Sequence, residues 1–392
     1  MDNNNLKEKN FEEDIERWLL EKGGYERGLQ MTYNKDAAID PMVLCDFIAE
    51  TQPKEWARYQ KIYGAENAPD QFYKVLQDDI SRYGLIYVLR NGIDDHGVKI
   101  RIAYFAPASE LNEELMRKYR ANRLHVIRQF GYTSKNRNTI DMVLMLNGIP
   151  VVALELKNQL TGQSVEDSKR QWMEDRDPNE FIFHFNNRIL AYFGVDLYEV
   201  AMTTQIQKEK TFFIPFNQGS NGAGNVGGAG NPAVAEGEYV TGYFWERVLQ
   251  RDALLSILQR YISVQKEEKI KIVINRSGKE KEVKEESTKI IFPRFHQLDV
   301  VERLTADTAA NGAGKNYLIQ HSAGSGKSNS IAWLTYRLAS LHDANQKDVF
   351  DTVFVITDRR VLNQQLQNTV LGLSRPDRAC GQIRARCSVT AG

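Results

Sequence analysis

Three charged residues stand in otherwise apolar sequence within residues 138–158, NTIDMVLMLNGIPVVALELKN. Asp141 lies in the first apolar run, and Glu155 and Lys157 lie in the second. Burying such side chains is unfavourable by several kcal/mol, in order of magnitude, unless they are paired or bind a metal. Two carboxylates beside a lysine can hold Mg²⁺ through oxygen ligands, while the ammonium orients a water for attack on a phosphodiester. The stretch therefore predicts a hydrolytic site, with a plain ion pair to Lys157 as the alternative.

The hydrolytic interpretation requires both acids on one face of a sheet. Successive side chains of a strand alternate between faces, so Glu155 and Lys157 share a face. A simple two-residue turn at Asn147-Gly148 would pair Asp141 with Leu154 and separate the acids. We therefore predict a connection of odd length or a β-bulge beside one acid, because either would pair Asp141 with Glu155.

A second candidate site lies in residues 317–341, YLIQHSAGSGKSNSIAWLTYRLASL. This stretch reads as a short strand, a glycine-rich turn and a helix, the context that a phosphate-binding loop requires. Backbone N–H groups near the glycines can surround phosphates, the lysine can reach the β and γ phosphates, and the serine that follows it can bind the Mg²⁺ of ATP. The predicted ATP-binding residues of this loop are Gly324, Ser325, Gly326, Lys327 and Ser328.

Several other elements must position these sites. Residues 11–25 place apolar side chains at helical spacing and end in Gly-Gly, which predicts an amphipathic helix. The apolar runs YGLIYVLRNG, IRIAYFAP and RLHVIRQFGYT, separated by short polar breaks, predict strands of a mixed sheet flanked by helices. Residues 217–232 are rich in glycine and predict a surface loop, while the charged residues 265–289 predict a solvated hairpin or linker.

Composition limits the class of protein. The chain has 392 residues, 42% of them hydrophobic, which is enough for two or three domains with their own cores. Lys plus Arg and Asp plus Glu number 51 each, so net charge neither supports nor excludes a nucleic-acid partner. The sequence has no apolar run of the roughly 18 residues that a membrane span needs, and its charged start is unlike a signal peptide. We therefore expect a cytoplasmic protein, whose three cysteines form no metal or disulfide framework.

The first site resembles the PD-(D/E)xK nuclease motif. Ile140-Asp141 takes the place of Pro-Asp, and Glu155-Leu156-Lys157 forms the second half. In related nucleases a downstream Gln-x-x-x-Tyr often supports the site; Gln171 is the nearest match here, with Asp175 at the tyrosine position. The resemblance implies that the two acids bind Mg²⁺. The catalytic residues that it implies are Asp141, Glu155, Lys157 and Gln171.

Related nucleases often place an acid on their first helix as well. Glu13 and Glu16 are the nearest matches in this chain. A role on the helix surface fits both residues equally well, so neither is included in the predicted site.

The segment Ala-Gly-Ser-Gly-Lys-Ser resembles motif I of superfamily 2 helicases, although the strict loop pattern fails at His321. Gln297 stands thirty residues before Lys327, as does the adenine-reading glutamine of that family. The stretch DTVFVITDRRVLNQQLQ, a predicted strand and helix, resembles motif Ia, which contacts the nucleic-acid backbone. Arg359 and Arg360 are its candidate DNA contacts, and a helix cap fits either arginine equally well.

A nuclease-like site followed by a superfamily 2 motor resembles the restriction (HsdR) subunit of type I restriction-modification enzymes, over roughly residues 11–370. The resemblance implies an ATP-dependent endonuclease that translocates double-stranded DNA, with Mg²⁺ and ATP as cofactors. Its partners would be the modification (M) and specificity (S) subunits, without a membrane. Another restriction or repair nuclease-helicase and a non-catalytic ATP-binding scaffold remain as alternatives.

The predicted fold class is α/β, in four segments. Residues 1–260 form an α+β nuclease domain of PD-(D/E)xK type with a mixed sheet, and residues 261–290 form a charged hairpin or linker. Residues 291–370 begin a RecA-like P-loop lobe. Residues 371–392 have four arginines and no helix or strand period, so we expect a truncated or frame-shifted end there. Because no Walker B acid pair or second lobe is recognised, we expect no ATP turnover from this chain alone.

Overall fold

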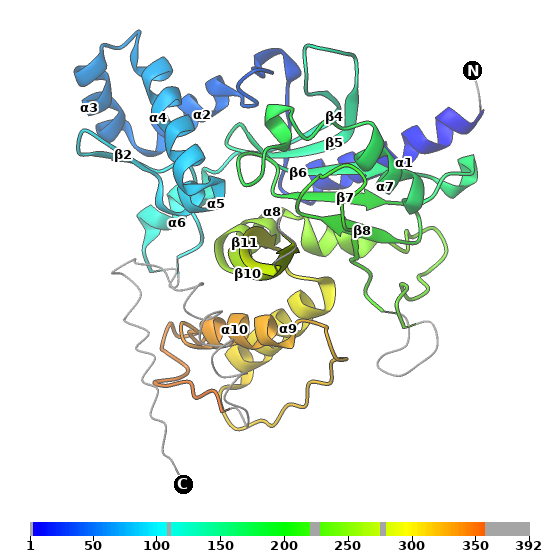
Figure 1. Cartoon of the computed structure of the whole chain (residues 1–392). Coiled ribbons are helices and arrows are strands. Elements are labelled where there is room, and N and C mark those ends of the chain that lie inside the picture. The colour runs from blue at the N-terminus through cyan, green and yellow to red at the C-terminus, as the bar shows by residue number, and fades with distance from the viewer. Residues whose placement is uncertain (1–2, 108–110, 220–227, 275–279, 357–392) are drawn as a thin grey trace. The chain divides into compact units, whose positions relative to one another are not determined.

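The computed structural model describes residues 3–107, 111–219, 228–274 and 280–356. The chain divides into two compact units (Figure 1). The first contains the residues up to Ala106 together with Glu113–Phe292, and the second contains Pro107–Asn112 together with the residues from Pro293 onward. None of the helices in the described ranges is long and apolar enough to cross a membrane.

A mixed seven-stranded sheet forms the centre of the first unit, in the order β1-β4-β5-β6-β7-β8-β9 (Figure 1). β1 runs parallel to β4 and β6 runs parallel to β7, while the other neighbours are antiparallel. The sheet confirms the predicted α/β class. Its strands are β1 (Glu26–Arg27), β4 (Leu124–Gly131), β5 (Thr139–Leu146), β6 (Ile149–Leu156), β7 (Ala191–Val195), β8 (Val200–Thr203) and β9 (Ile214–Pro215).

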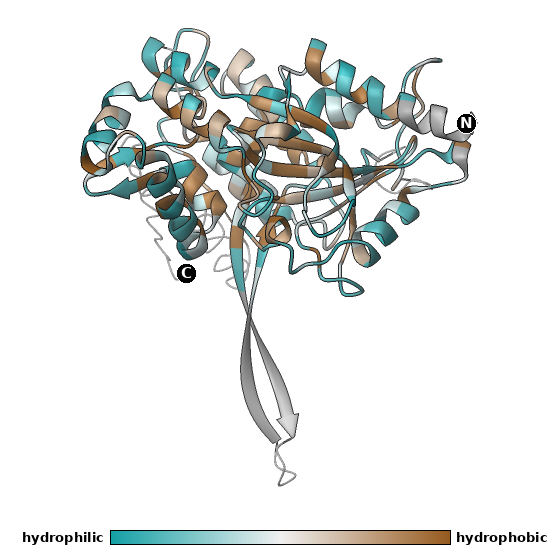
Figure 2. Cartoon of the chain, turned by 90° about the horizontal axis from the view of Figure 1, so that it is seen from above, coloured by the Kyte–Doolittle hydropathy of each residue, from teal (hydrophilic) through white to brown (hydrophobic). Residues whose placement is uncertain are grey.

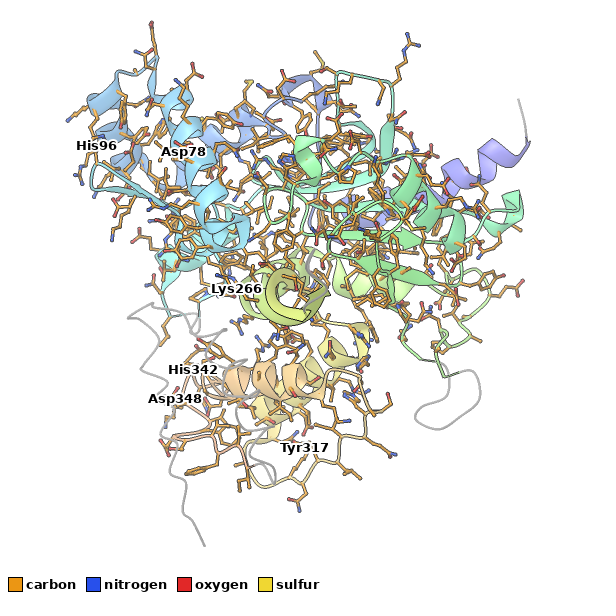
Figure 3. All side chains as sticks on the ribbon, viewed as in Figure 1. Asp78, His96, Lys266, Tyr317, His342 and Asp348 are labelled. Carbon is orange, nitrogen blue, oxygen red and sulfur yellow. The ribbon has the colours of Figure 1, made fainter. Side chains whose placement is uncertain are left out.

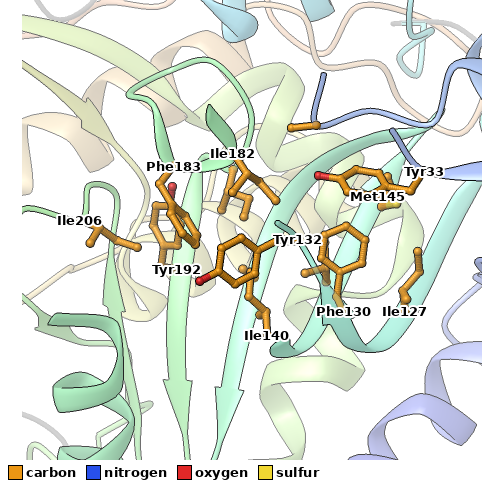
Figure 4. Close-up of a cluster of buried hydrophobic side chains, with 14 of the residues drawn as sticks. Tyr33, Ile127, Phe130, Tyr132, Ile140, Met145, Ile182, Phe183, Tyr192 and Ile206 are labelled. Atoms are coloured by element: carbon orange, nitrogen blue, oxygen red, sulfur yellow. The ribbon is translucent and has the colours of Figure 1, made fainter. Parts of the chain in front are cut away.

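The central strands are buried on both faces. Every residue of β6 is buried, which explains why the sequence there is a continuous apolar run rather than an alternating one. Figure 2 shows hydrophobic residues concentrated on these strands. On one side, aromatic rings from distant segments meet, among them Tyr132, Phe183 and Tyr192 (Figure 4). Trp172 lies edge-on to Tyr192 and to Phe183. The indole N–H of Trp172 also donates to the carbonyl oxygen of Phe193 (3.1 Å).

Helices cover and extend the sheet. α1 packs against β4 and β6, and α7 packs against β6, β7 and β8. The amphipathic helix predicted near residues 11–25 is α1, which ends just before the predicted Gly-Gly pair. The helices of the first unit include α1 (Asn3–Glu21), α2 (Pro41–Thr51), α3 (Pro53–Tyr63), α4 (Ala68–Tyr83), α5 (Leu85–Asn91), α6 (Glu113–Arg120), α7 (Val165–Glu174) and α8 (Arg251–Ser256). Short turns of 3₁₀-helix lie at Gln30–Thr32, Gln159–Thr161 and Phe181–Phe183, and π-helical turns lie at Phe244–Val248 and Ile257–Tyr261.

The run YGLIYVLRNG forms helix α5, so its prediction as a strand was wrong. A short apolar run has no period that separates a buried helix from a buried strand. Here Gly84 (φ 84°) and Gly92 (φ 71°) adopt left-handed backbone on either side and bound a short helix. Of the run IRIAYFAP, only Ile100 belongs to a strand, the short β3 (Val98–Ile100), which pairs with β2 (Ile93–Asp95).

The charged segment before the second unit forms an antiparallel ribbon, as predicted for a hairpin. β10 (Ser263–Ile274) pairs with β11 (Glu280–Ile291) along their full lengths. The ribbon belongs to the first compact unit, and the division between the units falls between Phe292 and Pro293. Residues 220–227, half of the glycine-rich loop predicted at residues 217–232, lie outside the described residues.

In the second unit, α9 (Phe295–Asn311) packs against α10 (Lys327–Leu338). The apolar runs at residues 317–320 and 352–356, both predicted as strands, form no strand in the described part of this unit. Leu318 is 94% exposed and Ile356 is 93% exposed. Strands exist through pairing with neighbours, and these two runs do not pair with each other. The described residues of this unit therefore contain two packed helices and none of the predicted strands.

Candidate active site

The register of β5 and β6 decides whether the two predicted acids can act together. Next to the Asn147-Gly148 turn, the strands pair as a simple hairpin would. A β-bulge then shifts the register by one residue, so that Met142 faces Leu154. One position further, Asp141 stands level with Glu155 on the same face. The predicted pairing of Asp141 with Glu155 on one face is confirmed, but the bulge that produces it lies near the turn and not beside an acid as predicted.

Glu155 is fully buried. Its Oε1 accepts a hydrogen bond from Arg176, whose guanidinium also donates to the carbonyl oxygen of Thr139 (2.8 Å). Burial raises the pKa of Glu155 well above its usual range, the charge of Asp141 raises it further, and Arg176 opposes both effects. The second oxygen, Oε2, is buried without a hydrogen-bond partner among the described residues. This oxygen is suited to bind a cation.

The carboxylate of Asp141, on β5, contacts both the backbone of β6 and the side chain of Lys157. Its Oδ2 accepts a hydrogen bond from the backbone N–H of Leu156 (2.8 Å) and lies 3.9 Å from Lys157 Nζ. Its Oδ1 lies 3.4 Å from Nε2 of Gln129. Lys157 is buried just after β6, where its backbone N–H donates to the carbonyl oxygen of Val195. The structure therefore brings together Asp141 and Lys157, and the bulge adds Glu155.

The first helix contributes an acid that the sequence analysis missed. Glu12 is 6% exposed, and the nearby charge of Asp141 adds to its burial in raising its pKa to about 7. Glu13 is more exposed and lies 3.5 Å from Arg128, while Glu16 pairs with Arg27 and Arg128. Helical periodicity contained the signal: the buried Phe11, Ile15 and Leu19 define the inner face of α1 and place Glu12 at its edge.

Arg176, just beyond α7, is a second residue that the sequence analysis missed. Its guanidinium lies 5.7 Å from the ring centroids of both Trp172 and Tyr132, and its side chain is almost fully buried. The predicted Gln171 lies on α7 and is partly exposed. From this region it is Arg176 that reaches Glu155. An arginine with no fixed spacing in the nuclease motif gave no signal in the sequence.

The donor set fits a hard divalent cation. Within the described ranges, no group of three or more His, Cys, Asp or Glu side chains is arranged to hold a metal ion. Asp141 and Glu155, however, stand level on neighbouring strands, and one Glu155 oxygen has no hydrogen-bond partner in the described structure. Mg²⁺ usually keeps several waters and binds proteins through one or two carboxylates. Two adjacent carboxylates are therefore a sufficient protein contribution.

The second predicted site is a glycine-rich loop at the start of α10. Gly324 (φ 75°) and Gly326 (φ 83°) adopt the left-handed backbone that lets the loop turn tightly. Lys327 Nζ donates to the carbonyl oxygens of His321 (3.2 Å) and Ser322 (3.0 Å), so the side chain lies folded over its own loop. The residue types and the helix start match a phosphate-binding loop.

Other predicted nucleotide-site residues lie around this loop. Gln297 is buried, and its Nε2 donates to the carbonyl oxygen of Gly326 (2.9 Å). Its amide therefore ties α9 to the loop, and the adenine contact stays a prediction. Ser325 is buried, and Ser328 is half-buried in the first turn of α10. The candidate DNA contacts Arg359 and Arg360 lie outside the described residues.

Comparison with known families agrees with the order of the two sites. Residues 5–211 match the type I restriction enzyme R protein N terminus, over more than half of the chain. This match includes the nuclease candidates of β5 and β6. Residues 296–385 match the SWI2/SNF2 ATPase family and include the glycine-rich loop. The chain therefore belongs to the family of type I restriction enzyme R proteins, restriction endonucleases that combine a nuclease part with an ATPase-like part.

Proposed function

We propose that the first unit hydrolyses phosphodiester bonds of double-stranded DNA with Mg²⁺ and that the glycine-rich loop of the second unit binds ATP for translocation. The observation that carries the nuclease assignment is the shared face of Asp141 and Glu155, with Lys157 Nζ 3.9 Å from Asp141. Without the bulge, the two acids would point away from each other.

Each side chain has a separate part in the proposed reaction. Asp141 and Glu155 would hold Mg²⁺, which lowers the pKa of a bound water and neutralises charge on the phosphate. Lys157 lies beside Asp141, where its ammonium orients the attacking water or stabilises the negative charge that develops on the phosphate. Arg176 engages only Oε1 of Glu155 and leaves Oε2 for the cation.

The ATP-binding residues of the proposal are those of the loop and Gln297. Lys327 must leave the carbonyl oxygens that it contacts here before it can reach the β and γ phosphates. Ser328 would bind the Mg²⁺ of ATP.

The family suggests the remaining parts of the proposal. Type I enzymes separate cleavage from sequence reading, so this subunit would contact DNA through its backbone while a specificity subunit reads the bases. Modification and specificity subunits are the proposed partners, and the cytoplasm is the proposed compartment. Gln171 stays a candidate supporting residue of the nuclease site, and Arg359 and Arg360 stay candidate DNA contacts.

The test is Mg²⁺ binding by this chain, followed by titration calorimetry. We expect binding that Asp141→Ala and Glu155→Ala each weaken strongly, because each removes one of two carboxylate ligands. Asp94→Ala is a matched control, because Asp94 is an exposed acid that pairs with Lys99 on the β2–β3 hairpin. Binding that is unchanged in both site variants would support the alternative, a structural ion pair in a non-catalytic ATP-binding scaffold.

A further inference from the structure

Gln129 is a strained residue within β4. Its φ is 47°, in the left-handed region that a side chain with a Cβ rarely adopts. The register of β4 with β5 places it level with Asp141. Strain of this kind persists only where the surroundings enforce it, and it concentrates at functional sites. Because Gln129 lies level with Asp141, a proposed metal ligand, its strained backbone points to a role in the site.

Gln30, in the 3₁₀ turn Gln30–Thr32, holds the strained backbone in place. Its Nε2 donates to the carbonyl oxygens of Gln129 (2.9 Å) and Arg128 (3.3 Å), and its Oε1 accepts from the backbone N–H of Gly131 (3.2 Å). One side-chain amide thus supplies the contacts that a neighbouring strand would make. Hydrogen bonds to Arg128 and Gly131, the residues before and shortly after Gln129, therefore hold its left-handed backbone in place.

The strained backbone lets two consecutive side chains reach one carboxylate. Arg128 Nε lies 3.3 Å from Glu12 Oε2, and Gln129 Nε2 donates to Glu12 Oε1 (2.9 Å). In a regular strand, consecutive side chains point to opposite faces. The same Gln129 amide lies 3.4 Å from Asp141 Oδ1, and its Oε1 accepts from the hydroxyl of Thr139 (3.0 Å). A single amide therefore links α1 with the β5 acid.

We propose that Gln129 is a positioning residue of the nuclease site, whose strained backbone is retained so that its amide fixes the carboxylates of Glu12 and Asp141 for cation binding. This inference rests on the proposed nuclease function. The amide acts through Asp141 rather than on the substrate, and the hydroxyl of Thr139 fixes which side of the amide faces the acids.

The strained backbone of Gln129 lets an experiment distinguish a role in the site from a purely structural role. Glycine adopts φ 47° without steric penalty, so a position needed only for its backbone shape is best served by glycine. Gln129→Gly and Gln129→Ala both remove the amide, and only the first relieves the strain. A purely structural crosslink would leave cation affinity unchanged in any variant that stays folded.

The experiment measures thermal unfolding and Mg²⁺ binding of the full chain for both variants. We expect Gln129→Gly to unfold at a higher temperature than Gln129→Ala, because it avoids the strain. We expect both variants to bind Mg²⁺ about tenfold more weakly than the unsubstituted chain, the usual effect of removing a group that orients a metal ligand. Wild-type Mg²⁺ affinity in the folded Gln129→Gly variant would overturn the proposal.

His96→Gly is the matched control for strain. His96 also has a left-handed backbone (φ 48°), and it lies exposed in the turn between β2 and β3 (Figure 3). We expect this variant to bind Mg²⁺ as tightly as the unsubstituted chain, and weakening equal to that of Gln129→Gly would overturn the assignment to the site. If Asp141→Ala binds Mg²⁺ normally, the nuclease proposal itself fails, and the inference fails with it for a distinguishable reason.

Discussion

The two units hold their candidate sites by different means. In the first unit, Asp141 and Glu155 lie on neighbouring strands of a buried sheet, and a buried arginine engages one of them. In the second unit, the lysine of the glycine-rich loop folds back on its own backbone, and the apolar runs at residues 317–320 and 352–356 are largely exposed. Sheet pairing and burial thus fix the positions of the candidate nuclease groups, whereas the proposed phosphate contact of Lys327 requires its side chain to leave its own loop.

The largest effect should come from the lysine of the preorganised site. Lys157→Ala, in the R subunit assembled with its modification and specificity partners, should reduce DNA cleavage by roughly 10²- to 10³-fold, because one stabilising charge of the transition state is lost. ATP hydrolysis by the same assembly should be nearly unchanged. Cleavage of circular DNA and phosphate release measure the two activities, with the exposed Lys99→Ala as control. Equal loss of both activities would contradict the assignment of DNA cleavage and ATP hydrolysis to separate units.

The next effect concerns the stability that the buried arginine gives to the first unit. Arg176→Ala leaves Glu155 buried without its ion-pair partner, which should lower the free energy of unfolding by about 3 to 5 kcal/mol. Denaturant unfolding measures this change. Arg170→Ala, which breaks an exposed pair with Asp167, should lower it by no more than about 1 kcal/mol. Similar effects of the two substitutions would contradict a preorganised site.

A smaller effect should appear in the pH dependence of stability. The pKa of Glu12 is raised from 4.5 to about 7, so the folded chain keeps a proton on this carboxylate that the unfolded chain releases above pH 4.5. The stabilisation by this proton is present at low pH and is lost as pH rises to about 7. Between pH 4.5 and about 7, the free energy of unfolding should therefore fall as pH rises. Glu12→Gln should reduce this fall by about 3 kcal/mol at most. If Glu12→Gln does not change the pH dependence of the unfolding free energy, the pKa of Glu12 is not raised in the folded chain.

The smallest effect should come from the loop of the second unit. Gln297→Ala removes the hydrogen bond to the carbonyl oxygen of Gly326 and should weaken ATP binding by roughly fivefold, the equivalent of about 1 kcal/mol. A fluorescent ATP analogue measures the affinity. Lys327→Ala is the reference for full loss of binding. An effect of Gln297→Ala as large as that of Lys327→Ala would indicate that the glutamine contacts the nucleotide directly.

The sequence by itself identified the residues of both candidate sites. Asp141, Glu155 and Lys157 could be recognised because charges within an apolar run need an explanation, and the glycine-rich loop because its residue types match the parts of a phosphate cradle. The need for a register shift between the acids also followed from the period of a strand. These conclusions depend on local patterns, which a sequence displays directly.

The tertiary structure decided which further residues join the nuclease site. Glu12, Arg176 and Gln129 reach the two acids from a helix, a loop and a strained strand position that are distant in sequence. Their roles depend on packing, and packing contacts between distant segments leave no local pattern. The structure also decided that YGLIYVLRNG is a helix and that the apolar runs at residues 317–320 and 352–356 form no strand among the described residues. An apolar run in a sequence indicates only that the segment favours burial. Whether it forms a strand depends on the segments that pack against it and pair with it.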